Sequence, residues 1–203
     1  MKIDTEHLHH WMQAIRQSNN PMRTMDAFWS GQLKSKEWLI DKLTPLIPIK
    51  HEPVTIDIHG GWVGTLASML FQSYIPIKSI QNIDIDPHTK HTSIEMNKIE
   101  EIQGRYKHIT VDMCTFNSIA DVIINTSSEH ITQYEYDMWL EQLPNNSLIV
   151  LQSNNYVIPE HVRIAHSIEE FIEQSHIDVV ASYSLELPLY TRYMIIGRKN
   201  VSQ

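Results

Sequence analysis

The sequence is poor in cysteine and glycine, and it has no long apolar run. Cys114 is the single cysteine among 203 residues, so the chain cannot form an internal disulfide bond. No apolar run approaches the roughly 18 consecutive residues that a membrane-spanning helix needs. The first residues, MKIDTEHLHHWM, carry acids and histidines where a secretory signal has its apolar core. These features predict a cytoplasmic protein that neither crosses a membrane nor is exported.

Basic residues are also scarce. The chain has 16 Lys and Arg residues against 24 Asp and Glu residues, which gives a net charge of -8. Nucleic-acid-binding proteins obtain much of their affinity from Lys and Arg side chains that neutralise phosphates, so the charge balance disfavours a nucleic-acid partner. Among the 12 histidines, His7 and His10 lie one helical turn apart without a cysteine or a third clear ligand. We therefore expect no metal site.

Short β-rich runs alternate with helical patterns from residue 52 onward. Between the runs, apolar residues recur at three- and four-residue spacing, which is typical of helices with one buried face. Such alternation predicts a parallel sheet covered by helices. The expected strands are 55–58, 79–85, 108–111, 121–125 and 147–152, and the expected helices are 65–74, 88–102, 132–143 and 161–174.

The end of the chain departs from this alternation. The strand-like runs 177–187 and 191–199 are separated by three residues, PLY. Three residues cannot hold a crossover helix, so these two strands are expected to be antiparallel neighbours.

The first fifty residues differ from the rest in pattern and in charge. They favour two helices, 6–17 and 25–43, and carry seven basic and five acidic side chains, whereas the remainder carries nine and 19. We therefore predict a helical N-terminal extension over residues 1–50 and an α/β domain over residues 51–203.

Three of the six glycines fall within five positions of VTIDIHGGWVG, namely Gly60, Gly61 and Gly64. In an open parallel sheet, the turn after the first strand approaches a bound ligand most closely. Glycine allows that approach and also tolerates positive φ. A sharp turn onto a tightly packed helix would need the same residues, so the glycines alone leave both interpretations open.

The second β-rich run ends in two acids, Asp84 and Asp86. A carboxylate at the end of the second strand can accept hydrogen bonds from both hydroxyls of a ribose. Asp86 precedes Pro87 and is suited to capping a helix whose first turn contains proline. We assign Asp84 to a ribose and Asp86 to the cap, with contact to a cofactor as its second role.

The order of these motifs resembles that of the class I S-adenosylmethionine-dependent methyltransferases. The motifs are VTIDIHGGWVG, IQNIDIDP, HITVDMCTF, ADVIINTSSEH and the two closing strands, over roughly residues 52–199. The resemblance implies a Rossmann-like α/β fold, with a mostly parallel seven-stranded sheet and an antiparallel last strand. It implies S-adenosylmethionine as the cofactor. The implied cofactor contacts are Asp57, His59, Gly60, Gly61, Trp62, Gly64, Asp84, Asp86, Asp112, Met113 and Asn125.

The segment NTSSEH follows the fourth strand and is rich in polar groups. Methyl transfer to an amine or a hydroxyl requires an oriented nucleophile and a proton acceptor. We predict Glu129 or His130 as the general base, and Asn125 as a further catalytic residue that hydrogen-bonds the substrate. The residues expected to contact the substrate are Ser127, Ser128, Asn154 and Tyr156. Alternatively, residues 126–128 cap the next helix and Glu129 lies in its first turn.

The leading interpretation is an S-adenosylmethionine-dependent methyltransferase that acts on a small molecule. A protein or peptide acceptor is the nearest variant. Two alternatives remain open at the level of sequence. One is a non-catalytic protein that binds S-adenosylmethionine in a regulatory role, which is favoured by His59 at a position where the family usually has glycine. The other is an enzyme that transfers the aminopropyl or aminobutyl group of the same cofactor, or cleaves it.

Overall fold

The computed structural model describes residues 4–47 and 52–200. The chain forms two compact units, of which the first ends at residue 111 and the second begins at residue 112. The predicted boundary between residues 50 and 51 lies outside the described residues. None of the helices in the described ranges has the length and apolar character that a membrane crossing requires.

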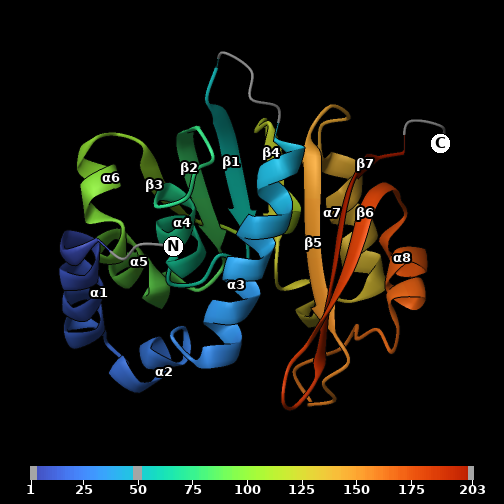
Figure 1. The fold of residues 1–203 in the computed structure, drawn as a ribbon, viewed down its shortest axis with the longest axis horizontal. Helices are drawn as coiled ribbons and strands as arrows, with labels where there is room; N and C mark the ends of the chain where they lie inside the picture. The colour runs from blue at the N-terminus through green and yellow to red at the C-terminus, as the bar shows by residue number, and fades with distance from the viewer. Residues whose placement is uncertain (1–3, 48–51, 201–203) are drawn as a thin grey trace. The chain divides into compact units, whose positions relative to one another are not determined.

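The first unit contains three parallel strands, β1 (Val54–His59), β2 (Ile77–Asp84) and β3 (Tyr106–Thr110). β2 lies between the other two and pairs with both (Figure 1). The last four residues of β1 are all buried, and the polar residues Asp57 and His59 are among them.

The second unit contains β4 (Val122–Asn125), β5 (Leu148–Asn154), β6 (Ile177–Glu186) and β7 (Thr191–Lys199). β4 pairs with β5 in parallel, and β7 runs antiparallel to both β5 and β6. The strand order of the seven-stranded sheet is β3-β2-β1-β4-β5-β7-β6. The predicted fold class and the antiparallel pairing of the two closing strands are confirmed.

The helices of the first unit begin with α1 (Thr5–Gln17), α2 (Pro21–Asp26) and α3 (Ser30–Leu43), with a 3-10 turn, η1 (Thr44–Leu46), after them. The prediction of one helix over 25–43 is wrong. The side chain of Asn20 accepts a hydrogen bond from Arg23 N, so a separate helix begins at Pro21 and ends before Trp29, the cap residue of α3.

α4 (Thr65–Phe71), η2 (Pro87–Thr89), α5 (Lys90–Met96) and α6 (Lys98–Ile102) complete the first unit. The predicted helix 88–102 is interrupted at Asn97, whose backbone leaves the helical region. The N-terminal helices pack onto these elements. Trp11 Nε1 donates a hydrogen bond to Ser68 Oγ at 2.7 Å, and His7 Nε2 lies 3.0 Å from Glu100 Oε1.

The helices of the second unit are α7 (Gln133–Gln142) and α8 (Ile168–Ser175), with 3-10 turns η3 (Met113–Thr115) and η4 (Ser128–His130). The prediction that a helix begins at residue 161 is wrong. Ser167 caps α8 by accepting a hydrogen bond from Glu170 N. In the segment before Ser167, the side chain of Arg163 is buried. Its guanidinium donates hydrogen bonds to Gln133 Oε1 at 2.7 Å and to Gln174 O at 2.9 Å.

Candidate functional site

The turn between β1 and α4 has an unusual backbone. Gly60, Trp62 and Gly64 have φ values of 65°, 49° and 75°. Positive φ is uncommon for a residue with a side chain, so Trp62 holds a strained conformation. The turn is closed by hydrogen bonds from Gly61 N to Ile83 O at 3.1 Å and from Gly64 N to Gly61 O at 3.0 Å. The sequence predicted the turn and its glycines.

Two buried amides fix this turn from the inside of the first unit. Asn82 Nδ2 donates to Trp62 O at 3.1 Å, and Asn97 Nδ2 donates to Gly64 O at 3.1 Å. A Cβ atom at Gly61 would overlap the side chain of Asn82, and one at Gly64 would lie 2.6 Å from Asn97 Nδ2. The glycines therefore let the two amides reach the backbone of the turn. Sequence analysis missed Asn82 and Asn97. The signal that the sequence offered is that each is an amide at a position where the strand or helix pattern predicts burial.

Replacing Gly64 by alanine is expected to destabilise the chain more than the same change at Gly104. Both residues have positive φ, but a Cβ atom at Gly104 meets nothing within 4 Å. The backbone penalty of about 1 kcal/mol applies to both variants, whereas the overlap with Asn97 adds roughly 1 kcal/mol or more at Gly64 alone. Urea denaturation of G64A and G104A measures the difference. Equal losses of unfolding free energy would contradict the tight contact.

The carboxylate of Asp84 is hydrogen-bonded to the backbone of the glycine turn. Its Oδ2 accepts a hydrogen bond from Trp62 N at 2.7 Å, and its Oδ1 accepts one from Asp86 N at 2.9 Å. Burial raises the pKa of this half-buried carboxyl group, although both backbone hydrogen bonds act in the opposite direction. Each oxygen keeps a further lone pair, so the carboxylate can still accept hydrogen bonds from two hydroxyl groups.

Asp86 caps η2, as predicted, by accepting a hydrogen bond from His88 N at 2.9 Å. Its other oxygen accepts a 2.6 Å hydrogen bond from Arg23 Nη1, which connects α2 to the end of β2. This hydrogen bond from Arg23 is the main reason why the pKa of Asp86 is lowered.

The two predicted cofactor contacts that lie in β1, Asp57 and His59, are both buried. Asp57 is 1% exposed and His59 is 0% exposed. Burial lowers the pKa of His59 to about 4, so its imidazole is neutral near pH 7. Contact of either residue with a cofactor stays a prediction.

The predicted cofactor contacts Asp112, Met113 and Asn125 lie in the second unit. Asp112 is exposed and caps η3 by accepting a hydrogen bond from Cys114 N at 2.9 Å. Met113 is buried, and its sulfur lies 3.7 Å from Asn125 Nδ2. The structure thus brings Met113 and Asn125 together, while their contact with a cofactor stays a prediction.

The NTSSEH segment ends in η4 and is not the cap of the following helix. Thr132 and Glu135 make a capping box at the start of α7, in which Thr132 N donates to Glu135 Oε2 at 2.7 Å. The alternative in which residues 126–128 cap this helix is therefore wrong. Ser127 N donates to Asn125 Oδ1 at 2.9 Å, and Ser128 Oγ donates to Gln152 O at 2.6 Å, which ties the turn to β5.

Glu129 is a buried carboxylate with one anchored oxygen. The residue is 2% exposed. Its Oε1 accepts hydrogen bonds from Asn154 Nδ2 at 2.5 Å and from Arg192 Nη1 at 3.2 Å. Within the described ranges, Oε2 is buried and has no hydrogen-bond partner. Asn154, predicted to contact a substrate, thus positions Glu129, and the position of Arg192 was not anticipated from sequence.

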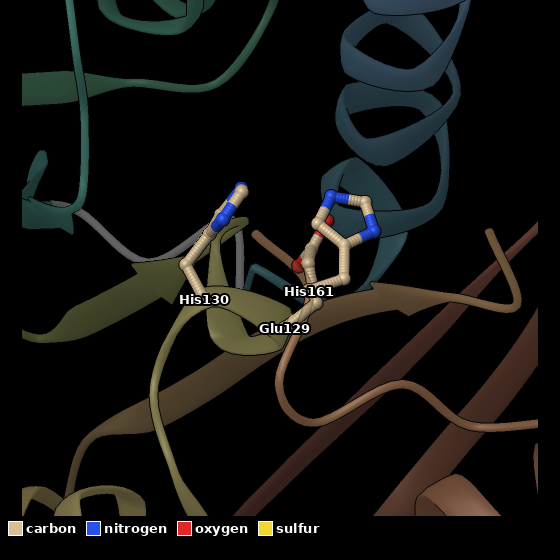
Figure 2. Close-up of side chains that lie close together, drawn as sticks. All are labelled: Glu129, His130 and His161. Carbon is tan, nitrogen blue, oxygen red and sulfur yellow. The ribbon is translucent and has the colours of Figure 1, made fainter. Parts of the chain in front are cut away.

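His130 and His161 lie beside Glu129 (Figure 2). The centroids of the two imidazole rings are 4.8 Å apart in an edge-to-face arrangement. Tyr156 follows, with its ring centroid 6.2 Å from that of His161 and 5.6 Å from that of Tyr190. Sequence analysis missed His161, which was assigned to a helix and is 31 positions from His130. The arrangement places a carboxylate, two imidazoles and two phenol rings in one cluster of the second unit.

Comparison with known proteins reveals similarity of structure without similarity of sequence. No family model and no curated protein sequence matches the chain. Magnesium protoporphyrin IX methyltransferase from Synechocystis PCC 6803, solved with bound SAH, superimposes with a TM-score of 0.66 at 12% identity, over 97% of this chain and 95% of that one. The chain has the class I methyltransferase fold.

Two further solved structures support the same assignment of the fold. Geranyl diphosphate methyltransferase, in complex with GPP and sinefungin, has a TM-score of 0.62 at 11% identity, over 83% of this chain and 78% of that one. Ribosomal protein L11 methylase from Lactobacillus delbrueckii subsp. bulgaricus has a TM-score of 0.56 at 14% identity, over 82% and 79%. The three proteins have different acceptors, so the fold leaves the acceptor of this chain open.

Proposed function

We propose that this protein is an S-adenosylmethionine-dependent methyltransferase that acts on a small molecule. The observation that carries the proposal is the first unit's glycine turn, whose strained backbone at Trp62 is hydrogen-bonded to the carboxylate of Asp84. This places a close-approach turn and a hydroxyl-binding carboxylate side by side, as recognition of an adenosine ribose requires. The similar magnesium protoporphyrin IX methyltransferase was solved with SAH and with SAM.

The chemistry assigned to this chain is orientation of the acceptor and removal of its proton. Methyl transfer is an in-line displacement, so the protein has to hold the nucleophile toward the sulfonium methyl group. Glu129 accepts hydrogen bonds from both Asn154 and Arg192, which suits it to positioning. His130 is exposed and keeps Nε2 available, so it is the better proton acceptor of the two.

An apolar groove in the N-terminal helices supports a small acceptor with an apolar part. The groove has a volume of about 430 Å³, within the range of small-molecule sites. Two of its lining residues, Met22 and Met25, lie close to Arg23 in the sequence of α2. Arg23 is hydrogen-bonded to Asp86 just after β2. Its lining residues are Leu8, Trp11, Met12, Ile15, Met22, Met25, Asp26, Phe28 and Trp29.

The net charge of -8 favours a small molecule over a nucleic acid as the acceptor. We assign the activity to the cytoplasm, since one cysteine leaves the fold independent of disulfide formation.

Replacing Asp84 by alanine is expected to weaken S-adenosylhomocysteine binding by roughly 1.5 to 3 kcal/mol, the cost of losing hydrogen bonds to a charged group. Isothermal titration calorimetry measures the change. Asp178 is an exposed aspartate of β6, so D178A is the matched control and should keep the affinity of the unchanged chain. Unchanged affinity in D84A would remove Asp84 from the site.

The products formed from S-adenosylmethionine separate the competing functions. Incubation with a pool of small-molecule acceptors should release S-adenosylhomocysteine if the protein transfers methyl groups. Release of 5′-methylthioadenosine would instead indicate transfer of the aminopropyl or aminobutyl group. Binding without turnover across such pools would favour the regulatory alternative.

A further inference from the structure

One carboxylate and two imidazoles converge in the second unit. Glu129 and His130 are neighbours in η4, and His161 comes from the segment between β5 and α8. Each offers a ligand atom, and these three atoms lie within 4.8 Å of one another. Figure 2 shows the side chains projecting to the same side of the backbone. The three groups are ordinary ligands of a divalent transition metal.

Each imidazole is hydrogen-bonded through Nδ1 to a backbone carbonyl oxygen, which leaves Nε2 as the possible ligand atom. His130 Nδ1 lies 3.1 Å from Glu160 O, and His161 Nδ1 lies 2.8 Å from Tyr156 O. A carbonyl oxygen only accepts hydrogen bonds, so each Nδ1 must carry the proton and each neutral ring keeps its lone pair on Nε2. A metal-bound histidine almost always donates its other N–H in this way. Both rings thus have an oriented Nε2 lone pair and a fixed tautomer.

The carboxylate is held in a similar manner. Glu129 Oε1 is anchored by Asn154 and Arg192, while Oε2 is buried and has no hydrogen-bond partner among the described residues. A buried carboxylate oxygen without a partner is costly, and a bound cation would satisfy it. Arg192 occupies the other oxygen, so its positive charge opposes the cation from the far side of the carboxylate.

The ligand set is closest to that of zinc with an open coordination position. Zinc sites of this kind use three protein ligands at about 2.0 to 2.2 Å, which places their donor atoms roughly 3.3 Å apart. The present spacing of up to 4.8 Å therefore has to shorten by as much as about 1.5 Å. His130 is exposed and His161 is half-buried, so rotation of these two side chains can close the site.

We infer that Glu129, His130 and His161 form a binding site for a divalent transition metal, with Zn²⁺ as the reference ion. This replaces the expectation of no metal site, which was based on spacing along the sequence. The site lies where β4 ends, and its open position suits an oxygen, nitrogen or sulfur atom of a ligand. Metal binding needs no S-adenosylmethionine, so the inference stands or falls separately from the proposed function.

The test is titration of the full metal-free chain with Zn²⁺, without S-adenosylmethionine. The unchanged chain should bind one ion that survives dialysis, and Co²⁺ in its place should give visible d–d absorption. E129Q keeps the size of its side chain, H161N keeps a polar but shorter side chain without Nε2, and each should weaken binding by on the order of 10²-fold or more. N154L, which removes one of the two anchors of the carboxylate and leaves Arg192, should weaken binding by roughly 10- to 100-fold.

His166 provides the matched control, because it is an exposed histidine of the same segment and lies outside the cluster. H166A should bind Zn²⁺ as tightly as the unchanged chain. Circular dichroism of each variant confirms that the comparison is made between folded proteins. The inference is overturned if the unchanged chain retains no zinc, if both E129Q and H161N keep full affinity, or if H166A loses as much affinity as they do.

Discussion

Replacing Arg192 by methionine is expected to lower the unfolding free energy by about 3–5 kcal/mol. Arg192 Nη1 lies 3.2 Å from Glu129 Oε1, and the two side chains are only 7% and 3% exposed. Methionine preserves much of the packing volume but leaves the Glu129 carboxylate in a buried site with Asn154 as its remaining anchor. An unpaired buried charge is costly, because the low-dielectric interior cannot replace its hydration.

The same substitution at Arg23 is the matched control. Arg23 forms an ion pair with Asp86 at 2.6 Å, but its side chain is 51% exposed, so R23M should cost at most about 1 kcal/mol. Urea denaturation in the presence of a metal chelator compares the two variants without any contribution from bound ions. The double variant E129Q/R192M should recover a large part of the loss. Equal destabilisation by R192M and R23M would show that the buried pair has no special importance.

Replacing His130 by alanine is expected to reduce turnover by on the order of 10²-fold or more, once an acceptor is known. The side chain presents its Nε2 lone pair beside Glu129 and His161, and alanine removes it. The loss is expected whether His130 takes the proton of the acceptor or holds a metal ion. Affinity for S-adenosylhomocysteine should stay nearly unchanged, because the proposed cofactor contacts are Asp84 and the glycine turn. Turnover and calorimetry together separate the two effects.

E129Q and H166A complete this experiment. E129Q should also lower turnover, whereas H166A should keep it, since the His166 side chain lies outside the cluster. Full turnover in both H130A and E129Q would mean that η4 has no catalytic role. A sulfur acceptor, which can react as a thiolate without either residue, would then be the first class of substrate to test.

The sheet was predictable from sequence because each strand carries its own local signal. Runs such as residues 121–125 and 147–152 are short, β-branched and bounded by polar residues, so their hydrophobic pattern alone identifies them. The segment 161–167 was misassigned because Arg163 and Ala165 are buried by tertiary contacts in an irregular backbone. Apolar spacing cannot distinguish that kind of burial from one face of a helix.

The candidate site was predictable only where its residues are close in sequence. The glycine turn and Asp84 follow strands in a familiar order, and NTSSEH is one continuous segment. His161 and Arg192 reach Glu129 through the fold, from 32 and 63 positions away in the chain. Asn82 and Asn97 act on the turn through buried hydrogen bonds, which a single sequence does not reveal.

The most direct test of the central claim is a crystal structure of the full chain with S-adenosylhomocysteine. The account predicts that the ribose hydroxyls lie within hydrogen-bond distance of the Asp84 carboxylate. It also predicts that the ligand lies against the backbone of residues 60–64, with the Trp62 φ angle still positive. S-adenosylhomocysteine bound away from both Asp84 and this turn, or no bound ligand at saturating concentration, would contradict it.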